Sequence, residues 1–184
     1  DNERRAALEK YGYRDDGLTG YVFGFQVPGT TPLYRLLNPG NGDHFYTTLE
    51  PDRDNAIANG GYQDEGIAGF VYSAPAVGTV PLYRLLNLTN GDHFYTTSKT
   101  EHDDAIAQII PPPLTIDDPT LEIFTSGHRP PRPMVETHIY QDESIACYVH
   151  STQVDHTIPF YRLLQVNGNT PPPRRIRGFV DVHN

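Results

Sequence analysis

The chain has 184 residues, enough for one domain with a buried core or for two small domains. Its formal net charge is −9 at pH 7, which makes nucleic acid and anionic membrane surfaces poor partners because their phosphate groups would repel it. A single cysteine excludes a disulfide framework and a cysteine-rich zinc site, and no apolar run is long enough for membrane insertion.

The first predicted elements are a helix over residues 2–9 and a strand over residues 12–23. Residues 32–38 and 43–48 then predict the two strands of a hairpin, because the Asn41-Gly42 pair between them is a strong turn signal. The chain contains 17 Pro and 16 Gly, and such frequent punctuation favours short strands joined by turns over long helices.

A short helix is expected after this hairpin, with Pro51 in its first turn and its end at residues 59–61. Residues 66–72 predict a third strand, in which two glycines favour a bulge or a close approach of the backbone. Later in the chain, Ser98 and Glu101 form a capping box ahead of a second short helix. Each unit is therefore expected to hold three strands and one helix.

This order of elements follows an internal repeat. Pro-Leu-Tyr-Arg-Leu-Leu-Asn occurs at 32–38 and 81–87, and Asn-Gly-Asp-His-Phe-Tyr-Thr-Thr occurs at 41–48 and 90–97, all at an offset of 49 residues. A third and weaker copy begins at Pro159, 78 residues further on. The difference of 29 residues falls in the proline-rich segment 108–137, which we expect to be a long surface excursion with little regular structure.

The third unit is divided between the two ends of the chain, and joining residues 159–184 to residues 1–23 restores the order of strands and helix. We therefore predict one domain over residues 1–184, mainly β with short helices. Its three internal repeats are expected to form a closed pseudo-threefold domain, either a trefoil-like barrel or a very small propeller. The other two units span residues 32–72 and 81–150. The third hairpin is predicted to be lost, because three prolines at 171–173 cannot form a central strand.

These motifs resemble a repeat of secreted bacterial and fungal proteins, whose pattern is roughly Tyr-Arg-Leu-Tyr-Asn-Pro, then Gly-x-His-Phe-Tyr-Thr, then Glu-Gly-Ile-Gly-Trp-Tyr. The resemblance covers about 150 of the 184 residues. In bacteria the repeat often accompanies wall-lytic and other surface enzymes as an accessory module. The resemblance implies a wall-associated, lectin-like domain of an extracellular protein, with the leader absent from the given chain. This chain has no tryptophan, so tyrosines would have to supply the aromatic surface.

The repeated hairpins hold the candidate ligand-binding residues. A tyrosine surface surrounded by arginine, histidine and carboxylate groups offers the apolar face and the hydrogen bonds that a sugar needs. Along a strand His44 and Tyr46 would share one face, while the face of Phe45 would form the core. The alternative is that the repeated His and Tyr side chains brace the fold. The residues predicted to bind a ligand are Tyr34, Arg35, Asp43, His44, Tyr46, Tyr83, Arg84, Asp92, His93 and Tyr95.

Arg35, Arg84 and Arg162 persist in all three units, including the one whose hairpin is predicted to be lost. This persistence favours a structural role over ligand contact. Acidic pairs that also persist are the expected partners, namely Asp15/Asp16, Asp64/Glu65 and Asp142/Glu143. Such pairs make a poor calcium site, because adjacent residues of a strand point to opposite faces. Neither a metal nor another cofactor is expected.

Two further residues invite a chemical interpretation. Cys147 stands where the other units have Gly20 and Gly69, so a buried and inert thiol is expected in preference to a nucleophile activated by a nearby histidine. Asn87 begins an Asn-Leu-Thr glycosylation sequon on a predicted turn, and it is the expected glycan site if a eukaryote secretes the protein.

The leading functional hypothesis is a secreted, non-enzymatic carbohydrate-binding protein that recognises cell-wall or surface glycans. Duplication of the polar and aromatic cluster favours it, because catalysis usually needs one asymmetric constellation. The first alternative is a hydrolase or nuclease that uses His44 or His93 with a carboxylate. The second is a defence or inhibitor protein that binds a protein partner through the 108–137 loop.

Overall fold

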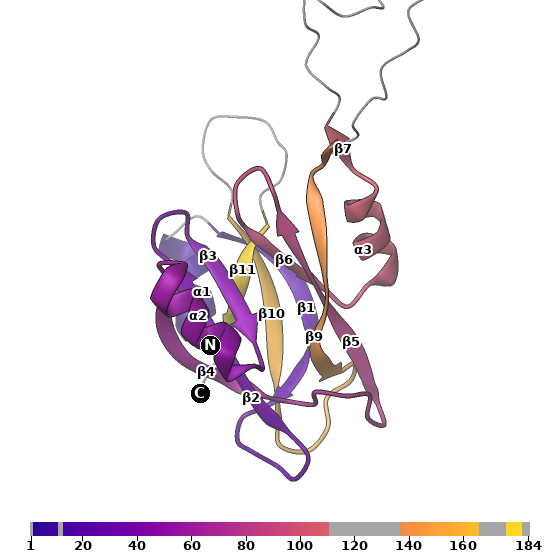
Figure 1. The fold of residues 1–184 in the computed structure, drawn as a ribbon. Helices are drawn as coiled ribbons and strands as arrows, with labels where there is room; N and C mark the ends of the chain where they lie inside the picture. The colour runs from indigo at the N-terminus through magenta and orange to yellow at the C-terminus, as the bar shows by residue number, and fades with distance from the viewer. Residues whose placement is uncertain (1, 11–12, 111–136, 166–175, 182–184) are drawn as a thin grey trace, which may run out of the picture.

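The fold was analysed in a computed structural model that describes residues 2–10, 13–110, 137–165 and 176–181. The protein is mainly β, with three short helices set around the strands (Figure 1). The helices are α1 (Asn2–Lys10), α2 (Glu50–Asn59) and α3 (Lys99–Ile106). The strands are β1 (Tyr13–Phe23), β2 (Thr31–Asn38), β3 (Asp43–Thr47), β4 (Gln63–Val71), β5 (Thr79–Asn87), β6 (His93–Thr96), β7 (Ile109–Ile110), β8 (Thr137–His138), β9 (Tyr140–His150), β10 (Thr157–Gln165) and β11 (Ile176–Asp181).

Nine of these strands form one antiparallel sheet with three arms. In each arm a middle strand pairs on both sides: β2 with β3 and β4, β5 with β6 and β9, and β10 with β11 and β1. The arms meet through β1, which pairs with β4 at Phe23↔Phe70 and with β9 at Tyr21↔His150. The pairing path runs from β3 to β6 without returning to its start, so the hydrogen-bonded sheet is not a closed barrel as the sequence had suggested.

The arm built from the two ends of the chain is completely paired. β1 and β10 pair from Tyr13↔Gln165 to Phe23↔Thr157, although about 140 residues separate them. β11 pairs with β10, and α1 lies beside β11, as expected for a unit whose parts come from both termini. The prediction that the third hairpin is lost is wrong, because β10 and β11 form it. Its three prolines precede β11 and lie outside the described residues.

The 108–137 segment connects α3 to β9. β7 and β8 pair at Ile109↔His138 and Ile110↔Thr137, which brings the two ends of the segment together. Residues 111–136 lie outside the described part of the chain, so the expectation of a surface excursion there stays a prediction.

Each arm has a bulge at its acidic pair. The side chain of the first acid accepts a hydrogen bond from the backbone N–H two residues further on, at 3.1 Å for Asp15, 2.8 Å for Asp64 and 2.7 Å for Asp142. The donor residues have positive φ angles of 99° at Gly17, 89° at Gly66 and 71° at Ser144. The register of the adjoining strand pair shifts at this point in all three arms. The first acid therefore stabilises the turn.

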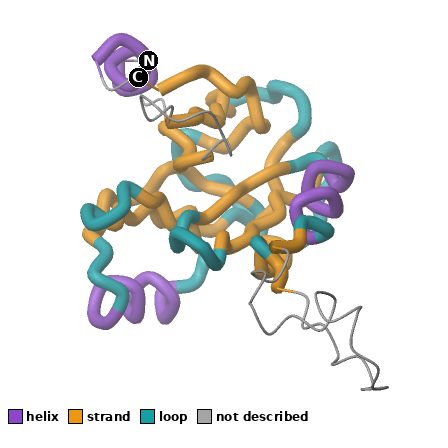
Figure 2. The backbone as a smooth tube through the Cα atoms, turned by 90° about the horizontal axis from the view of Figure 1, so that it is seen from above, coloured by secondary structure: helices purple, strands orange, loops and turns teal. Residues whose placement is uncertain are grey.

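The helices lie at separate corners around the strands (Figure 2). Each one packs a cationic or imidazole side chain on the tyrosine that precedes the repeated arginine. The guanidinium of Arg53 lies 4.5 Å from the ring centre of Tyr34, that of Arg4 lies 4.0 Å from Tyr161, and the ring of His102 lies 4.5 Å from that of Tyr83. These contacts explain why the three tyrosines recur in register.

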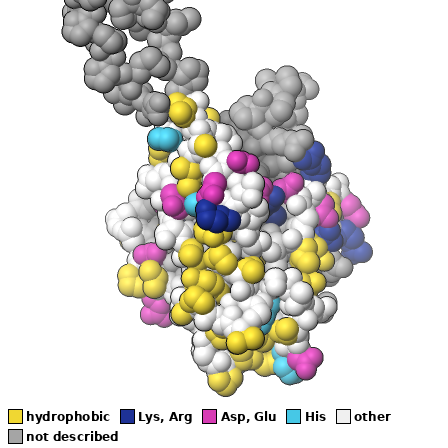
Figure 3. All heavy atoms as spheres, turned by 90° about the vertical axis from the view of Figure 1, so that its right-hand side faces the viewer, with side chains coloured by type: hydrophobic (Ala, Val, Ile, Leu, Met, Phe, Trp, Pro, Cys, Tyr) yellow, Lys and Arg dark blue, Asp and Glu magenta, His cyan; other side chains and the backbone are white. Residues whose placement is uncertain are grey.

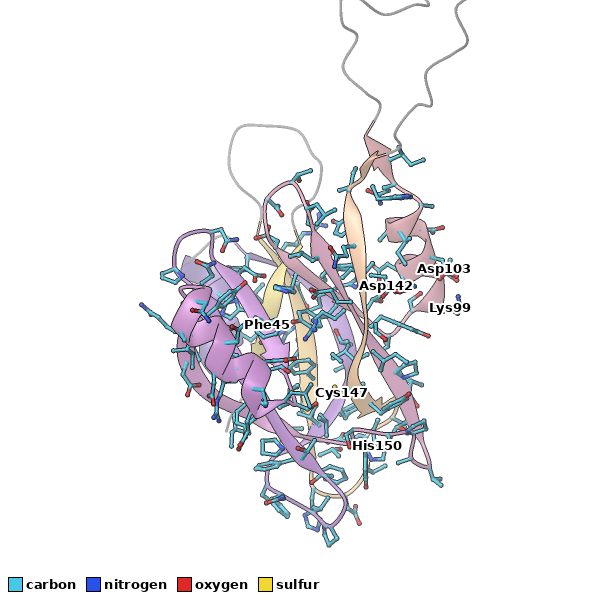
Figure 4. All side chains as sticks on the ribbon, in the orientation of Figure 1. Phe45, Lys99, Asp103, Asp142, Cys147 and His150 are labelled. Atoms are coloured by element: carbon cyan, nitrogen blue, oxygen red, sulfur yellow. The ribbon has the colours of Figure 1, made fainter. Side chains whose placement is uncertain are left out.

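The arms share a core at their centre. Tyr46 and Phe160 are fully buried and Tyr95 is 1% exposed, with ring centres 5.4 Å apart for Tyr46–Tyr95 and 5.6 Å for Tyr46–Phe160. Cys147 lies in the same core, between the strands (Figure 4), and burial raises the pKa of its thiol to about 12. The expected burial of this thiol is therefore confirmed, and its raised pKa disfavours the reactive thiolate. A Cβ atom at Gly69 would lie 2.6 Å from the side chain of Val22, so this position needs glycine.

Three aromatic rings from the three arms pack together just beyond this core. Phe23, Tyr72 and His150 occupy equivalent positions of the repeat, with ring centres 5.4 to 6.1 Å apart and planes 75° to 85° apart. His150, at the end of β9 (Figure 4), is 8% exposed, and both of its ring nitrogens are buried without a hydrogen-bond partner among the described residues. Burying the imidazole therefore lowers stability at a position where the equivalent residue of another arm is phenylalanine.

We expect His150→Phe to stabilise the fold by about 1–3 kcal/mol, because it removes the burial of two unsatisfied polar atoms and keeps an edge-to-face ring. Urea unfolding of both proteins measures the change. Tyr72→Phe is the matched control, since it keeps the ring and alters only a half-buried hydroxyl, and it should change stability by less than about 0.5 kcal/mol. A lower stability of His150→Phe would contradict the expectation.

Candidate functional site

Two equivalent clusters of an arginine, a glutamate and a histidine lie on two arms of the sheet. In the first, the Arg35 cluster, Glu65 Oε2 on β4 lies 2.8 Å from Arg35 Nε on β2 and 3.2 Å from His44 Nε2 on β3. Arg35 and His44 also approach one another directly, with 3.3 Å between their side-chain nitrogens. One carboxylate thus joins all three strands of this arm.

The second, the Arg84 cluster, repeats this arrangement. Glu143 Oε2 on β9 lies 2.9 Å from Arg84 Nε on β5 and 3.3 Å from His93 Nε2 on β6. The Arg84 guanidinium also donates to the backbone carbonyl of Tyr46 at 3.2 Å and lies over the ring of Phe45 on β3 (labelled in Figure 4). The Arg84 cluster therefore holds two neighbouring arms together.

Asp43 completes the Arg84 cluster from the neighbouring arm. Its carboxylate is fully buried and accepts from the His93 backbone N–H at 2.7 Å, from His93 Nδ1 at 2.7 Å and from the Tyr62 hydroxyl at 2.6 Å. Burial alone would raise the pKa of Asp43, but the hydrogen bonds and positive charge of His93 hold it below its ordinary value of 3.8. Asp43 is therefore ionised at neutral pH.

Both nitrogens of His93 face carboxylates. Burial alone would lower the pKa of His93. The hydrogen bonds to Asp43 and Glu143 together have the larger effect and raise this pKa to about 8. The imidazole is therefore mainly protonated at pH 7. A general base needs a free lone pair near neutral pH, so His93 is poorly suited to that task.

The raised pKa of His93 predicts a loss of stability on the alkaline side. Because the value rises from 6.5 to about 8 on folding, its stabilisation is fully present below pH 6.5 and is lost as the pH passes 8. The difference corresponds to about 2 kcal/mol. Chemical unfolding between pH 6 and 9 measures it, with His93→Gln as the control that should lack this alkaline decline.

The carboxylates of the same cluster predict a loss of stability on the acidic side. The pKa of Glu143 is held below 4.5 despite burial, which would raise it, because His93 and Arg84 favour its charged form. The stabilisation from Glu143 and Asp43 is therefore present above their ordinary values of 4.5 and 3.8 and is lost as the pH falls further. A flat stability profile from pH 3 to 9 would contradict both limbs.

The pairing of each repeated arginine with an acidic residue is confirmed, and in each arm the partner is the second acid of the pair. Arg35 binds Glu65, Arg84 binds Glu143, and Arg162 Nε lies 2.7 Å from Asp16. Arg162 also lies 2.7 Å from Glu101 on α3 and donates to the backbone carbonyl of Tyr95 at 3.3 Å. The arginines therefore have a structural role within and between arms.

The predicted tyrosine surface is not present in the described structure. Tyr46 and Tyr95 point into the central core, and the expectation that only the phenylalanine side of the hairpin forms core is wrong, because both sides of β3 are buried. Tyr34 is 8% exposed and its hydroxyl donates to Glu50 at 3.0 Å beside α2. Tyr83 faces α3. None of the four offers an open ring face next to a histidine.

The remaining predicted residues are also largely covered. Asp92, the counterpart of Asp43, is 3% exposed and accepts from the Asn90 side chain at 2.8 Å. Asn87 is half-buried, and its side-chain oxygen accepts from the backbone N–H and the hydroxyl of Thr89 at 2.9 and 2.6 Å. Asn87 thus stabilises the turn that holds its sequon, and glycosylation there stays a prediction.

Sequence reasoning missed the contact between Asp43 and His93. It named both residues as ligand contacts, but they lie in different units and 50 residues apart, so no local spacing indicates that they touch. It also named Glu65 and Glu143 only as partners of arginine. The available signal was that Arg and His recur at an offset of 49 residues and the glutamate at an offset of 78, which includes the 29-residue insertion.

The glutamate of each cluster is partly exposed and is followed closely in sequence by an exposed aliphatic side chain. The side chains of Glu65 and Glu143 are 30% and 21% exposed. Two residues beyond them in sequence, Ile67 and Ile145 are 41% and 39% exposed, and Leu18 takes the same place in the third arm at 46%. Figure 3 shows hydrophobic side chains gathered beside a few charged ones on the side that contains α3 and β5.

The described residues give little support to other kinds of functional site. Within them, no group of three or more His, Cys, Asp or Glu side chains is arranged to hold a metal ion. On the outer side of α3, Lys99 and Asp103 form an exposed ion pair of 2.6 Å, and His102 Nε2 lies 3.3 Å from Asp142 on β9 (Figure 4). The first contact lies within α3, and the second attaches α3 to the sheet.

Comparisons with known proteins give one match. The model of a family described as a domain of unknown function (DUF5648) matches residues 1–109, which hold α1 and β1, the whole unit over residues 32–72, and the hairpin and helix of the next unit. No curated protein and no solved structure matches the chain. None of the helices in the described ranges is both long enough and apolar enough to span a membrane.

Proposed function

The chain belongs to the DUF5648 family, a domain of unknown function, and from this premise we propose that it is a non-enzymatic, lectin-like module that binds cell-wall or surface glycans. One observation carries the proposal: the same Arg–Glu–His cluster occurs on two arms, with an exposed aliphatic residue two positions beyond its glutamate. A repeated small surface of this kind suits a repeated ligand such as a glycan chain.

The state of the histidines supports binding over catalysis. His93 is held between two carboxylates and is mainly protonated at pH 7, and His44 is 8% exposed with its Nε2 next to both Glu65 and Arg35. A hydrolase or nuclease of the kind considered above would need one of these imidazoles to take up a proton from water or substrate. The inhibitor alternative depends on the 108–137 loop, most of which lies outside the described residues.

The proposed binding surface is the exposed edge of each cluster. A sugar ring can place its apolar face on Ile67 or Ile145 and its hydroxyls against the neighbouring glutamate. Two such surfaces on one domain favour a polymer, because a chain bound at one surface holds its next residues near the other. An extracellular location, in keeping with such a ligand, stays a prediction.

We further propose that the three arms form a pseudo-threefold domain. The equivalent strand pairings support it, and so do three equivalent turns. The hydroxyls of Thr30, Thr79 and Thr157 each donate to the carbonyl three residues earlier, at 2.7 to 2.8 Å. Lateral contacts of β11 with β3 and β6, which are side-by-side packing without strand pairing, would complete the ring.

A glycan array followed by calorimetry tests the proposed function. We expect binding to wall polysaccharides, and a loss of affinity of about tenfold or more in the double variant Ile67→Ala/Ile145→Ala, because each change removes apolar contact from one surface. Val77→Ala is the matched control, since Val77 is 97% exposed and lies in the turn before β5, away from β4 and β9 in sequence. A protein that binds no neutral or acidic wall glycan would refute the proposal.

A further inference from the structure

Three asparagine–glycine pairs with the same intrinsic chemistry lie in the described residues, namely Asn41-Gly42, Asn59-Gly60 and Asn90-Gly91. In such a pair the glycine nitrogen can attack the side-chain carbonyl carbon of the asparagine, because glycine has no side chain to obstruct the approach. A fourth pair, at residues 167–168, lies outside the described residues. Because the three pairs are identical, their relative rates in the folded protein depend on how readily each one leaves its folded geometry.

The pairs that begin at Asn41 and Asn90 are fixed in the turns of the two repeated hairpins. Asn41 Oδ1 accepts from the Asp43 backbone N–H at 3.0 Å, and Asn41 Nδ2 donates to the backbone carbonyl of Asn90 on the neighbouring arm at 3.1 Å. Asn90 Oδ1 accepts from the Asp92 backbone N–H at 3.0 Å, and its Nδ2 donates to the Asp92 carboxylate at 2.8 Å. Each glycine N–H also donates to the carbonyl four residues earlier, at 2.7 and 2.8 Å. Since Asp43 and Asp92 are buried, opening either turn disturbs the interior of its arm.

Asn59 lies at the exposed end of α2, a helix without a single buried residue. Its side chain donates to Asn55 Oδ1 at 2.8 Å, one turn earlier on the same helix. The Gly60 N–H donates to the carbonyl of Ala56 at 2.9 Å. Both bonds lie within α2 and its cap, so fraying of the last turn releases the asparagine side chain and the glycine nitrogen together. This pair therefore opens at a lower cost than the two pairs in the turns.

We propose that Asn59 is a deamidation site of the folded protein, at which the asparagine is converted to aspartate and isoaspartate. When the last turn of α2 opens, the Gly60 nitrogen bonds to Cγ of Asn59 and gives up its proton, and the side-chain amide group leaves as ammonia. Water then opens the cyclic imide at either of its two carbonyls, which gives aspartate or isoaspartate. The site is independent of the glycan-binding function proposed above.

Deamidation places a negative charge at the C-terminal end of α2. The helix dipole is negative at this end, and the last turn of α2 has no basic side chain. The added charge therefore favours further fraying. The modification weakens the last turn of the helix that covers Tyr34, which is held by Arg53 and Glu50 from the same helix.

The test compares the folded protein with the same chain unfolded in urea, both at pH 7.5. Peptide mapping by mass spectrometry gives the conversion rate at each site, because Arg53 and Arg84 lie between the three pairs and trypsin separates them. The ratio of the folded rate to the unfolded rate removes the intrinsic chemistry of each pair. We expect this ratio to be about tenfold or more higher at Asn59 than at the two turns. A ratio at Asn59 that is equal to or below that of either turn would overturn the proposal.

Asn59→Gln is the matched chemical control, because glutamine closes the corresponding larger ring much more slowly. The variant should lose the modification in the peptide that contains residue 59. A peptide that is still converted at the original rate would place the reaction at another residue, such as Asn55, and would also overturn the proposal.

Asn59→Asp tests the effect of the product on the helix. Hydrogen exchange of the Gly60 N–H, followed by NMR, should be about two- to fivefold faster in Asn59→Asp than in Asn59→Gln, because only the aspartate adds charge to the end of α2. Equal exchange in the two variants would refute the predicted weakening of the helix.

Discussion

Asp43→Asn is expected to lower the free energy of unfolding by about 3–5 kcal/mol. The substitution keeps the shape of the side chain but removes the negative charge that faces His93 Nδ1 at 2.7 Å inside the protein. The imidazolium of His93 then loses one of its two carboxylates, and the Tyr62 hydroxyl loses a charged acceptor. Urea unfolding followed by circular dichroism measures the loss.

Asp64→Asn is the matched control for this prediction. It also removes one aspartate charge, but Asp64 is exposed and its side-chain oxygen accepts from the Gly66 backbone N–H, a bond that asparagine can also make. Its effect should stay within about 0.5 kcal/mol. The pairing itself is measured by the double-mutant cycle of Asp43→Asn with His93→Gln, and a coupling energy near zero would show that the two residues stabilise the fold independently.

Tyr95→Ala is expected to destabilise the protein by about 3–5 kcal/mol and to abolish cooperative unfolding if the total stability is smaller than that. Tyr95 is 1% exposed, packs edge-to-face on Tyr46 and contributes to the core shared by the three arms. Loss of the ring leaves a cavity at the junction of the arms. Thermal and urea unfolding measure the change.

Tyr95→Phe divides this effect into its parts. The ring remains, but the Tyr46 backbone N–H loses the hydroxyl that accepts from it at 2.7 Å, so we expect a smaller cost of about 1–3 kcal/mol. If Tyr95 instead contacted a ligand directly, Tyr95→Phe would weaken glycan binding and leave stability unchanged. That result would contradict the placement of Tyr95 in the core.

The first two hairpins and the arginine pairs could be predicted because they follow from local pattern and repetition. The turn signal at Asn41-Gly42 sets a hairpin by itself, and an arginine that recurs with an acidic pair at constant spacing indicates a bond within the unit. The burial of Tyr46 could not be predicted in this way. Alternation along a strand assigns side chains to two faces, but it does not reveal that a helix covers one face and the other arms cover the opposite one.

The third hairpin shows the same limit of prediction from local pattern, because here a strand pairing was excluded that the structure contains. Three prolines in a row excluded residues 171–173 from a strand, but they did not exclude a strand further along, and Ile176–Asp181 supplies it. A long connection between paired strands costs little more than a short one, because loop-closure entropy grows slowly with length. Prediction from the sequence alone therefore overestimated the effect of the three prolines on the third hairpin.

By itself, the sequence determined that the chain is a mainly β protein of repeated units, that its arginines pair with its recurring acids, and that its one thiol is buried. These properties depend on residue type and on spacing along the chain. Only the tertiary structure decided that Asp43 binds His93 and that His44 has no equivalent partner among the described residues. The partners of a buried imidazole come from strands that meet in space, and their distance along the chain has no bearing on whether a carboxylate reaches it.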